Sequence, residues 1–290
     1  MSEQPSESLG WIGLGAMGWP MAGHLHRAGT LTAVWNRSHE KAEAFAEQHA
    51  GIDIADSPAE LARQARVIMV CVSADEDFNA VLADMLGQLE PGQIVVDHST
   101  ISPATARQAA RRLAEAGVGL VDAPVTGGVE GAVTGNLAIM AGGEWDHFRA
   151  IREFLGAYSR VAHHLGPSGS GQAGKAVNQL MVAGIAEAVC ESLALLERLD
   201  LPREPMLELL AGGAAGNWFL DKRGRSMLAD EFDHGFDPKL LLKDLRICHA
   251  LCQEAGFESG VVSQALDDYA RLVETDDPGR DISALIRLKN

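Results

Sequence analysis

The sequence is short of basic residues. It has 24 lysines and arginines against 40 aspartates and glutamates, which gives a formal net charge of -16 at pH 7. Nucleic acids and anionic membrane surfaces bind through a basic face, so we expect neither as a partner. An anionic ligand would have to be held by helix N-termini and a few placed cations, because the overall field repels it.

Cysteine is scarce as well. The 290 residues include four, and two of them, Cys248 and Cys252, lie one helical turn apart with no second pair to complete a metal site. Cys71 and Cys190 stand alone in the sequence. We therefore expect no metal, and reduced thiols in a cytoplasmic protein.

Long uninterrupted hydrophobic stretches are absent too. The apolar stretch 180–196 is interrupted by two glutamates and a serine, which predicts a buried helix rather than a membrane span. The polar, acidic opening of residues 1–7 has neither a basic region nor an apolar stretch and is typical of a frayed terminus, not of a targeting signal.

The alternation of apolar strands with helical patterns predicts an α/β fold with a Rossmann-type, doubly wound and mostly parallel sheet. Near Gly166 the character changes, because a turn-rich bridge at 167–171 leads into segments that are almost all helical in pattern. We expect a dinucleotide-binding domain over residues 1–166 and an all-α domain for substrate binding and dimerisation over residues 167–290. The expected strands are 9–12, 31–35, 67–72, 94–97, 119–122, 137–141 and 161–164, and a long helix is expected over 172–198.

A glycine pattern follows the first expected strand and opens a helix, as a dinucleotide fold requires. Gly13 would make the tight turn, Gly15 would let a pyrophosphate approach the backbone, and Gly18 would let helix and strand pack closely. The helix N-terminus would add N–H groups and the positive end of its dipole. The expected phosphate-binding residues are Gly13, Leu14, Gly15, Ala16, Met17 and Gly18.

The end of the second expected strand predicts which nucleotide is preferred. An NAD-selective site places a carboxylate there for the ribose 2′-hydroxyl, but this chain has Asn36, Arg37 and Ser38. Arg37 can fork onto a 2′-phosphate, with Asn36 and Ser38 as neutral donors. We therefore expect NADP(H) to be preferred over NAD(H).

Four further segments carry polar residues at strand ends or on helices: DHSTISP at 97–103, DAPVTGG at 122–128, GSGQAGKAVNQ at 169–179 and KLLLKDL at 239–245. Together with the stretch 13–21 they resemble the β-hydroxyacid dehydrogenase family, which includes 3-hydroxyisobutyrate dehydrogenase and the tartronate, glyoxylate and succinic semialdehyde reductases. The resemblance runs over nearly the whole chain. It is specific for the family and not for the substrate.

The resemblance implies that Lys175 is the catalytic residue. Hydride transfer to a carbonyl carbon leaves a developing alkoxide that needs a proton, which a lysine ammonium can supply and a lysine amine can take back in oxidation. Asn178 and Gln179 lie three and four residues further on, on the same helical face, where an amide can steer the substrate hydroxyl. Relatives usually carry Asn at the second of these positions, so which amide acts stays open.

The resemblance also implies the residues that hold substrate and cofactor. Thr126, Gly127 and Gly128 look like the family's cradle for a substrate carboxylate, although the first position is usually Ser. Lys243 is expected to reach the cofactor and the substrate, with Asp244 holding it in place. Further cofactor contacts are expected from Val72, Ser73 and Thr100.

Two residues later in the chain are candidates for the substrate pocket. An aromatic side chain in the region of Trp218 walls that pocket in relatives. We also expect Arg223 to bind a distal anionic group of the substrate, which would favour a substrate with a second charge. This second hypothesis depends only on the position of Arg223 after Trp218.

The expected function is NADP(H)-dependent interconversion of a small 3-hydroxy acid and its aldehyde, a small anionic substrate. The alternatives are an imine reductase-like enzyme, against which Lys175 speaks because those enzymes often carry Asp or Tyr there, and a non-catalytic NADP(H)-binding sensor or scaffold. A 6-phosphogluconate dehydrogenase would be longer. The helix 172–198 is apolar on more than one face, which predicts a homodimer or homotetramer.

Overall fold

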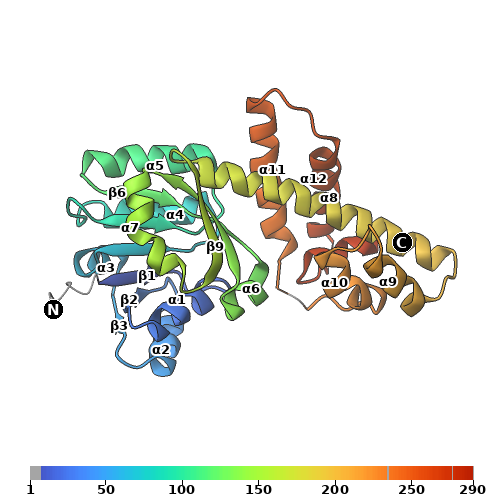
Figure 1. Ribbon diagram of the computed structural model, residues 1–290, viewed down its shortest axis with the longest axis horizontal. Helices are drawn as coiled ribbons and strands as arrows, with labels where there is room; N and C mark the ends of the chain where they lie inside the picture. Colours follow the sequence, from blue (N-terminus) through green and yellow to red (C-terminus); the bar gives the residue numbers. More distant parts are fainter. Residues whose placement is uncertain (1–7, 234, 276, 290) are drawn as a thin grey trace. The chain divides into compact units, whose positions relative to one another are not determined.

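The computed structural model describes residues 8–233, 235–275 and 277–289 of the chain (Figure 1). It divides into two compact units, the first ending at Lys175 and the second beginning at Ala176. The frayed terminus expected at residues 1–7 lies outside the described residues.

The first unit is built on a mostly parallel sheet in the order β3-β2-β1-β4-β5-β6-β8-β7, with β9 paired to β8. Strand β8 is antiparallel to β6 and β7 and parallel to β9. The order turns back between β1 and β4, as in a doubly wound fold. The strands are β1 Leu9–Ile12, β2 Leu31–Trp35, β3 Asp53–Ile54, β4 Val67–Val70, β5 Ile94–Asp97, β6 Gly119–Asp122, β7 Val125–Thr126, β8 Leu137–Gly143 and β9 Ser159–Gly166.

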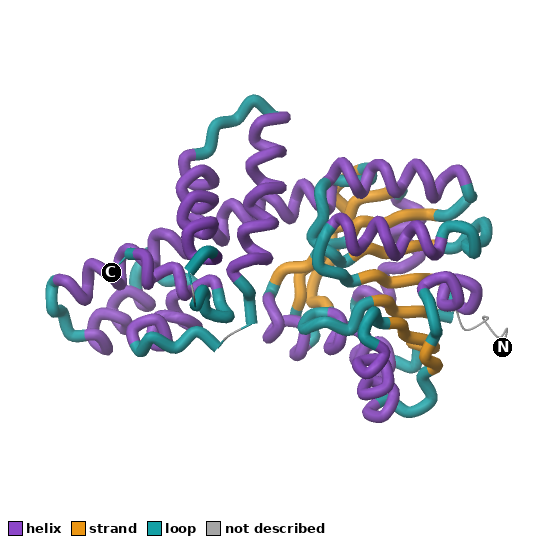
Figure 2. Tube along the Cα trace, turned by 180° about the vertical axis from the view of Figure 1, so that it is seen from behind, coloured by secondary structure: helices purple, strands orange, loops and turns teal. Residues whose placement is uncertain are grey.

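Helices cover both faces of this sheet (Figure 2). Each face has its own apolar core: Trp11 and Met69 belong to one, Ile12 and Ile68 to the other. Neighbouring residues of a strand point to opposite faces of the sheet, and helices cover both faces, so all four side chains are fully buried. The helices are α1 Gly18–Arg27, α2 His39–Gln48, α3 Pro58–Gln64, α4 Asp75–Met85, α5 Pro103–Glu115, α6 Gly128–Thr134 and α7 Trp145–Leu155.

The predicted Rossmann-type sheet is confirmed, with differences at its margins. Strands β1, β2, β5 and β6 have the expected bounds, whereas β4 ends at Val70 rather than at residue 72, and β8 and β9 are longer than predicted. Strands β3 and β7 were not predicted. Each has two residues, too few to show a pattern of alternation.

The second unit is helical, apart from its connections, in the residues that the structure describes. Its main apolar cluster includes Leu193, Leu241 and Tyr269, and a smaller one includes Cys248 and Val262. Asn217 and Ser259 cap two of its helices by accepting hydrogen bonds from backbone N–H groups in their first turns. The helices are α8 Ser170–Arg198, α9 Arg203–Gly212, α10 Trp218–Leu228, α11 Pro238–Glu254, α12 Gly260–Val273 and the 3-10 helix η1 Ile282–Leu288.

Helix α8 belongs to both units. Its first residues, up to Lys175, pack with the sheet, so the compact units divide inside the helix. The domain bounds expected from the sequence, 1–166 and 167–290, stay a prediction. Length and composition alone would let α8 cross a membrane. Half of its most apolar window is buried inside the protein, however, and core helices of soluble proteins pass the same test.

Candidate active site

The glycine loop between β1 and α1 has room for a ligand on one side only. Gly13 has a φ of 96°, and a Cβ there would lie 2.2 Å from the carbonyl oxygen of Cys71. A Cβ on Gly18 would lie 2.0 Å from the carbonyl oxygen of Gly13, whereas one on Gly15 would meet no atom within 4 Å. Two glycines are thus required by the fold, and the third leaves open space where a pyrophosphate would meet the backbone, which fits a dinucleotide.

Asn36, at the end of β2, holds this loop in place. Its Oδ1 accepts a hydrogen bond from the N–H of Leu14 at 2.8 Å, and its Nδ2 donates one to the carbonyl oxygen of Ser38 at 2.9 Å. The amide therefore has a structural use that the sequence did not reveal. Ser38 is exposed at the start of α2.

Arg37 lies at the same strand end with its side chain in solvent. The side chain is 84% exposed, and its Nη1 lies 2.8 Å from Oδ1 of Asp77 in the first turn of α4. Exposed ion pairs are worth less than about 1 kcal/mol, so this one does not fix the guanidinium. A 2′-phosphate would compete with Asp77 for the same cation.

The ends of β4 and β5 are joined by short polar contacts. The hydroxyl of Ser99 accepts a hydrogen bond from the N–H of Val72 at 2.9 Å. Thr100 follows, half-buried, and Ser73 is exposed beside Val72. The predicted cofactor residues Val72, Ser73 and Thr100 thus lie in two consecutive loops at one edge of the sheet.

His98 joins the end of β5 to the end of β6 beneath this edge. Its Nδ1 lies 2.7 Å from the carbonyl oxygen of Ala123, and its Nε2 lies 2.8 Å from the hydroxyl of Tyr158. Burial lowers the pKa of His98 to about 4, so the ring is neutral at pH 7. The indole of Trp11 stacks on it at 5.6 Å and donates from Nε1 to the carbonyl oxygen of Gly13.

The segment 126–128 leaves the sheet as an exposed backbone turn. Thr126 is half-buried at the end of β7, and the next two residues are exposed glycines with φ of 130° and 65°. Side chains would be strained at both angles, which explains the glycine pair. The chain then enters α6, so backbone N–H groups are available here. The carboxylate cradle at Thr126, Gly127 and Gly128 stays a prediction.

Lys175 lies in the second turn of α8. Its side chain is buried, with 8% of the residue exposed, and its Nζ donates a hydrogen bond to the carbonyl oxygen of Val125 at 2.9 Å. A carbonyl oxygen orients the ammonium without adding a charge beside it. Buried lysines are rare, and a buried lysine at the start of a helix beside a strand end is a candidate for chemistry.

Further along α8, two amides and an ion pair form a chain of contacts within the second unit. Asn178 donates from Nδ2 to Oε1 of Gln179 at 2.9 Å, and Gln179 donates from Nε2 to Oδ2 of Asp244 at 2.6 Å. Lys243 Nζ lies 3.1 Å from Oδ1 of Asp244, which is the pairing expected from the sequence. Gln179 is buried and uses both ends of its amide, whereas Asn178 is half-buried.

Arg223 and Trp218 also contact each other in the second unit. The guanidinium lies 5.2 Å from the indole centroid, and its Nε lies 3.3 Å from Oδ1 of the buried Asp281. Asp281 in turn accepts hydrogen bonds from the N–H and the hydroxyl of Ser283. Arg223 therefore has a structural partner, and its contact with a substrate stays a prediction. Trp218 is 51% exposed.

Two family models cover nearly the whole chain. Residues 8–166 match the NAD binding domain of 6-phosphogluconate dehydrogenase, and residues 169–289 match the domain described as NAD-binding of NADP-dependent 3-hydroxyisobutyrate dehydrogenase. The chain belongs to the β-hydroxyacid dehydrogenase family. This confirms the resemblance inferred from the sequence motifs.

Known members of the β-hydroxyacid dehydrogenase family and similar structures differ in cofactor. An uncharacterized oxidoreductase of Shewanella frigidimarina is 37% identical over 82% of this chain and 83% of its own. An NAD-dependent L-serine dehydrogenase of Pseudomonas aeruginosa is 29% identical over 97% of each chain. The solved structure of Psf3 in complex with NADP+ and 2-OPP is 26% identical, with a TM-score of 0.88 over 97% of this chain and 100% of that one.

Two buried polar residues of this chain were missed by sequence reasoning. Asp122 and Gln172 are buried side chains that join β5 and β6 to the start of α8. Both lie inside segments that carried the family resemblance, and this was the only signal in the sequence. Their partners are separated from them by 50 and 73 positions along the chain.

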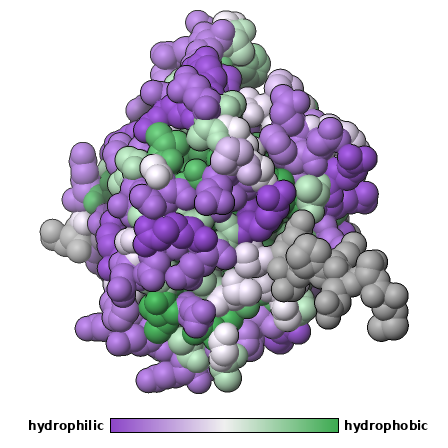
Figure 3. Space-filling view, turned by 90° about the vertical axis from the view of Figure 1, so that its left-hand side faces the viewer, coloured by the Kyte–Doolittle hydropathy of each residue, from purple (hydrophilic) through white to green (hydrophobic). Residues whose placement is uncertain are grey.

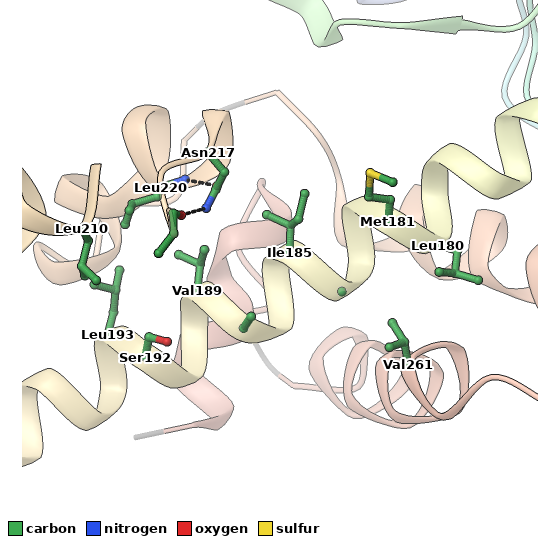
Figure 4. A pocket seen from close by; sticks show the side chains of 13 residues that line it. Leu180, Met181, Ile185, Val189, Ser192, Leu193, Leu210, Asn217, Leu220 and Val261 are labelled. Atoms are coloured by element: carbon green, nitrogen blue, oxygen red, sulfur yellow. Dashed lines mark hydrogen bonds between the residues drawn. The ribbon is translucent and has the colours of Figure 1, made fainter. Parts of the chain in front are cut away.

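The second unit carries a largely apolar groove of about 430 Å³ along α8, between it and residues of α9, α10 and α12 (Figure 4). Ile185 and Val189 lie along its length, with Leu210 at one end and Val261 at the other. By contrast, hydrophilic residues predominate on the face drawn in Figure 3. Among the described residues no group of three or more His, Cys, Asp or Glu side chains is placed to hold a metal ion.

Proposed function

We propose that this chain is an NADP(H)-dependent oxidoreductase that interconverts a small 3-hydroxy acid and its aldehyde, with Lys175 as general acid and base. One observation carries the proposal: in a chain of this family, the ammonium of Lys175 is buried and is hydrogen bonded to the carbonyl oxygen of Val125 at the start of α8.

The chemistry assigns one task to Lys175. A bound nicotinamide nucleotide supplies hydride to a carbonyl carbon, or removes it from an alcohol. In reduction the ammonium of Lys175 donates a proton to the substrate oxygen, and in oxidation the amine accepts it. The hydrogen bond to Val125 keeps Nζ in one orientation between the two protonation states, because a carbonyl oxygen accepts from either.

Substrate contacts are assigned to the amide and backbone donors. We assign the substrate hydroxyl to Asn178, because Gln179 uses both ends of its amide on Asn178 and Asp244. A carboxylate would accept hydrogen bonds from the turn at 126–128, and Lys243 would add positive charge in a chain whose net charge is -16. Relatives support a small hydroxy acid: the Pseudomonas enzyme is named for L-serine.

The preference for NADP(H) is supported by Arg37 and by the NADP+ complex of Psf3. No carboxylate stands at the end of β2, where an NAD-selective site would carry one. The NAD-dependent relative shows that the family also uses the other nucleotide. Direct comparison of KM for NADPH and NADH therefore tests this part of the proposal.

A substrate panel tests the activity itself. NADPH oxidation would be followed with glyoxylate, succinic semialdehyde, tartronate semialdehyde and methylmalonate semialdehyde, and NADP+ reduction with serine and 3-hydroxyisobutyrate. We expect turnover with at least one of these. Tight NADPH binding without turnover on any of them would favour a sensor, and turnover only with a ketone and an amine together would favour an imine reductase.

We also propose that the chain forms a homodimer or homotetramer through the second unit. Val177, Met181, Leu195 and Leu199 on or next to α8 are each more than half exposed, and Leu209 on α9 is 70% exposed. Exposed apolar side chains that recur along one helix in this number support an interface between copies of the chain. Light scattering at micromolar concentration should give at least twice the 30.8 kDa mass of the chain, and a monomer would contradict the proposal.

A further inference from the structure

The start of α8 is held by a buried carboxylate from the end of β6. Oδ1 of Asp122 accepts a hydrogen bond from the N–H of Gly169 at 2.8 Å, and Oδ2 accepts one from the N–H of Gln172 at 3.0 Å. The first N–H groups of a helix have no partner within it, so a carboxylate there satisfies two of them and faces the positive end of the dipole. Asp122 is fully buried.

The side chain of Gln172 makes a second attachment, to the loop after β5. Its Oε1 accepts from the N–H of Ile101 at 3.2 Å, and its Nε2 donates to the carbonyl oxygen of Ser99 at 2.8 Å and to Oδ2 of Asp97 at 3.4 Å. One amide thus connects the first turn of α8 to the strand next to β6. Gln172 is 1% exposed, so these hydrogen bonds are shielded from water.

The helix start has no room to shift toward the sheet. A Cβ on Gly171 would lie 2.4 Å from the carbonyl oxygen of Asp122 and 2.6 Å from that of Met140. A Cβ on Gly142, in β8, would lie 2.7 Å from the N–H nitrogen of Gly171. Backbone meets backbone here, which fixes the depth at which α8 begins.

The segment that begins with Asp122 also holds Lys175. Val125, three residues after Asp122, provides the carbonyl oxygen that accepts from Nζ, and Lys175 lies three residues after Gln172, about one helical turn further on. The strand segment 122–125 therefore holds the helix backbone at one end and the ammonium at the other.

We infer that Asp122 and Gln172 are positioning residues for Lys175: they fix the first turn of α8 so that the ammonium meets the substrate oxygen at a set depth. This inference rests on the proposed role of Lys175. Burial raises the pKa of the Asp122 carboxyl, and hydrogen bonds from the N–H groups of Gly169 and Gln172 oppose the rise. These hydrogen bonds are strongest to the charged carboxylate, so Asp122 holds the start of α8 in its ionised form.

Two isosteric substitutions each exchange a hydrogen-bond donor and acceptor at one end of a side chain. Asp122→Asn replaces one acceptor by a donor that faces a backbone N–H, and Gln172→Glu replaces the donor that faces Ser99 and Asp97 by an acceptor. Asp268→Asn is the matched control, because Asp268 is 2% exposed and its hydrogen bonds go to side chains of the second unit, among them Lys289 at 2.6 Å. Gln172→Glu keeps the inference testable if Asp122→Asn does not fold.

Two measurements on the full chain separate positioning from simple stability. Amide hydrogen exchange over residues 168–176 of the nucleotide-free protein should become at least about tenfold faster in Asp122→Asn and in Gln172→Glu. The hydrogen bonds that these substitutions disrupt protect the backbone amides of this segment from exchange. The kcat for aldehyde reduction should fall by about 100-fold, with the KM for NADPH within about twofold, since a shift of 1 Å has a cost of this order. Asp268→Asn should change neither measurement, even if it lowers Tm.

A double variant with Lys175→Met completes the test. If the two residues act through Lys175, adding Asp122→Asn to Lys175→Met should change the residual rate by less than about twofold. Two results would overturn the inference while leaving the role of Lys175 intact. One is that the losses of rate caused by Asp122→Asn and by Lys175→Met multiply in the double variant. The other is that both single variants exchange faster and keep an unchanged kcat. A fully active Lys175→Met variant would overturn the inference and the proposed role together.

Discussion

Nδ1 of His98 donates a hydrogen bond to the carbonyl oxygen of Ala123, 2.7 Å away. The oxygen can only accept, so the proton of the neutral ring lies on Nδ1, and Nε2 accepts from the hydroxyl of Tyr158 at 2.8 Å. This arrangement requires the uncharged imidazole, and burial lowers its pKa to about 4 from the ordinary 6.5.

Acid should therefore destabilise the protein in a defined window. Below pH 6.5 the unfolded chain binds a proton at His98 that the folded protein refuses until about pH 4, so the free energy of unfolding falls as the pH falls through this range. From pH 7 to pH 5 this residue should account for about 2 kcal/mol. In urea unfolding, the free energy of unfolding of His98→Asn, which keeps a donor for Ala123, should fall by about 2 kcal/mol less between pH 7 and pH 5 than that of the wild type. The exposed His39→Gln should behave as wild type, and equal slopes in all three proteins would refute the assignment.

Gly15→Ala should weaken nucleotide binding without loss of stability. Its Cβ would meet no protein atom within 4 Å and would project into the space left for the pyrophosphate, so we expect the Kd for NADPH to rise about tenfold or more with Tm unchanged. Calorimetric titration and thermal unfolding measure the two effects. Gly87→Ala, in similarly open space away from the loop, is the control. A lower Tm with unchanged affinity would show that the loop is not the phosphate site.

Arg37→Ala should remove most of the preference for NADPH. A guanidinium bound to a 2′-phosphate contributes about 1.5–3 kcal/mol, so the KM for NADPH should rise about tenfold or more while that for NADH stays within twofold. Asp77→Asn should have the opposite effect on NADPH, because it removes the carboxylate that competes for Arg37. Arg63→Ala, an exposed arginine on α3, is the control. An unchanged ratio of the two KM values in Arg37→Ala would contradict the assignment.

Asn178 and Gln179 should fail in different ways. Asn178→Ala should lower kcat/KM about tenfold, the cost of one hydrogen bond to the substrate, with little change in Tm. Gln179→Ala should lower the free energy of unfolding by about 1–3 kcal/mol, because it leaves the buried Asp244 without its 2.6 Å partner. Steady-state kinetics and urea unfolding of both variants separate the two roles. A purely kinetic loss in Gln179→Ala would make Gln179 the working amide.

Much of the fold could be predicted because the relevant signals are local, whereas the expected site residues stay a prediction. Runs such as Val67–Val70 are fully buried and apolar, and the glycine loop carries its own spacing. The two-residue strand Val125–Thr126 has no such signal, since it exists only through pairing with β8. Helix α4 starts with three acidic residues and was not predicted, although acidic side chains favour a helix N-terminus.

Contacts between distant segments could not be predicted. Asp122 and Gln172 belong to motifs that the sequence brought to attention, yet their roles depend on which backbone groups stand opposite them in the folded chain. The same holds for Arg223, whose pairing with Asp281 spans 58 positions. Sequence patterns give the type of a residue and its element, and the packed structure gives its partner.

The role of Lys175 is tested most directly by Lys175→Met, which keeps an unbranched side chain of similar length and removes the proton. The kcat for aldehyde reduction by NADPH should fall by a factor of about 10² to 10⁴, while the Kd for NADPH stays within about twofold. A Lys175→Met variant that turns over at the wild-type rate would contradict the account.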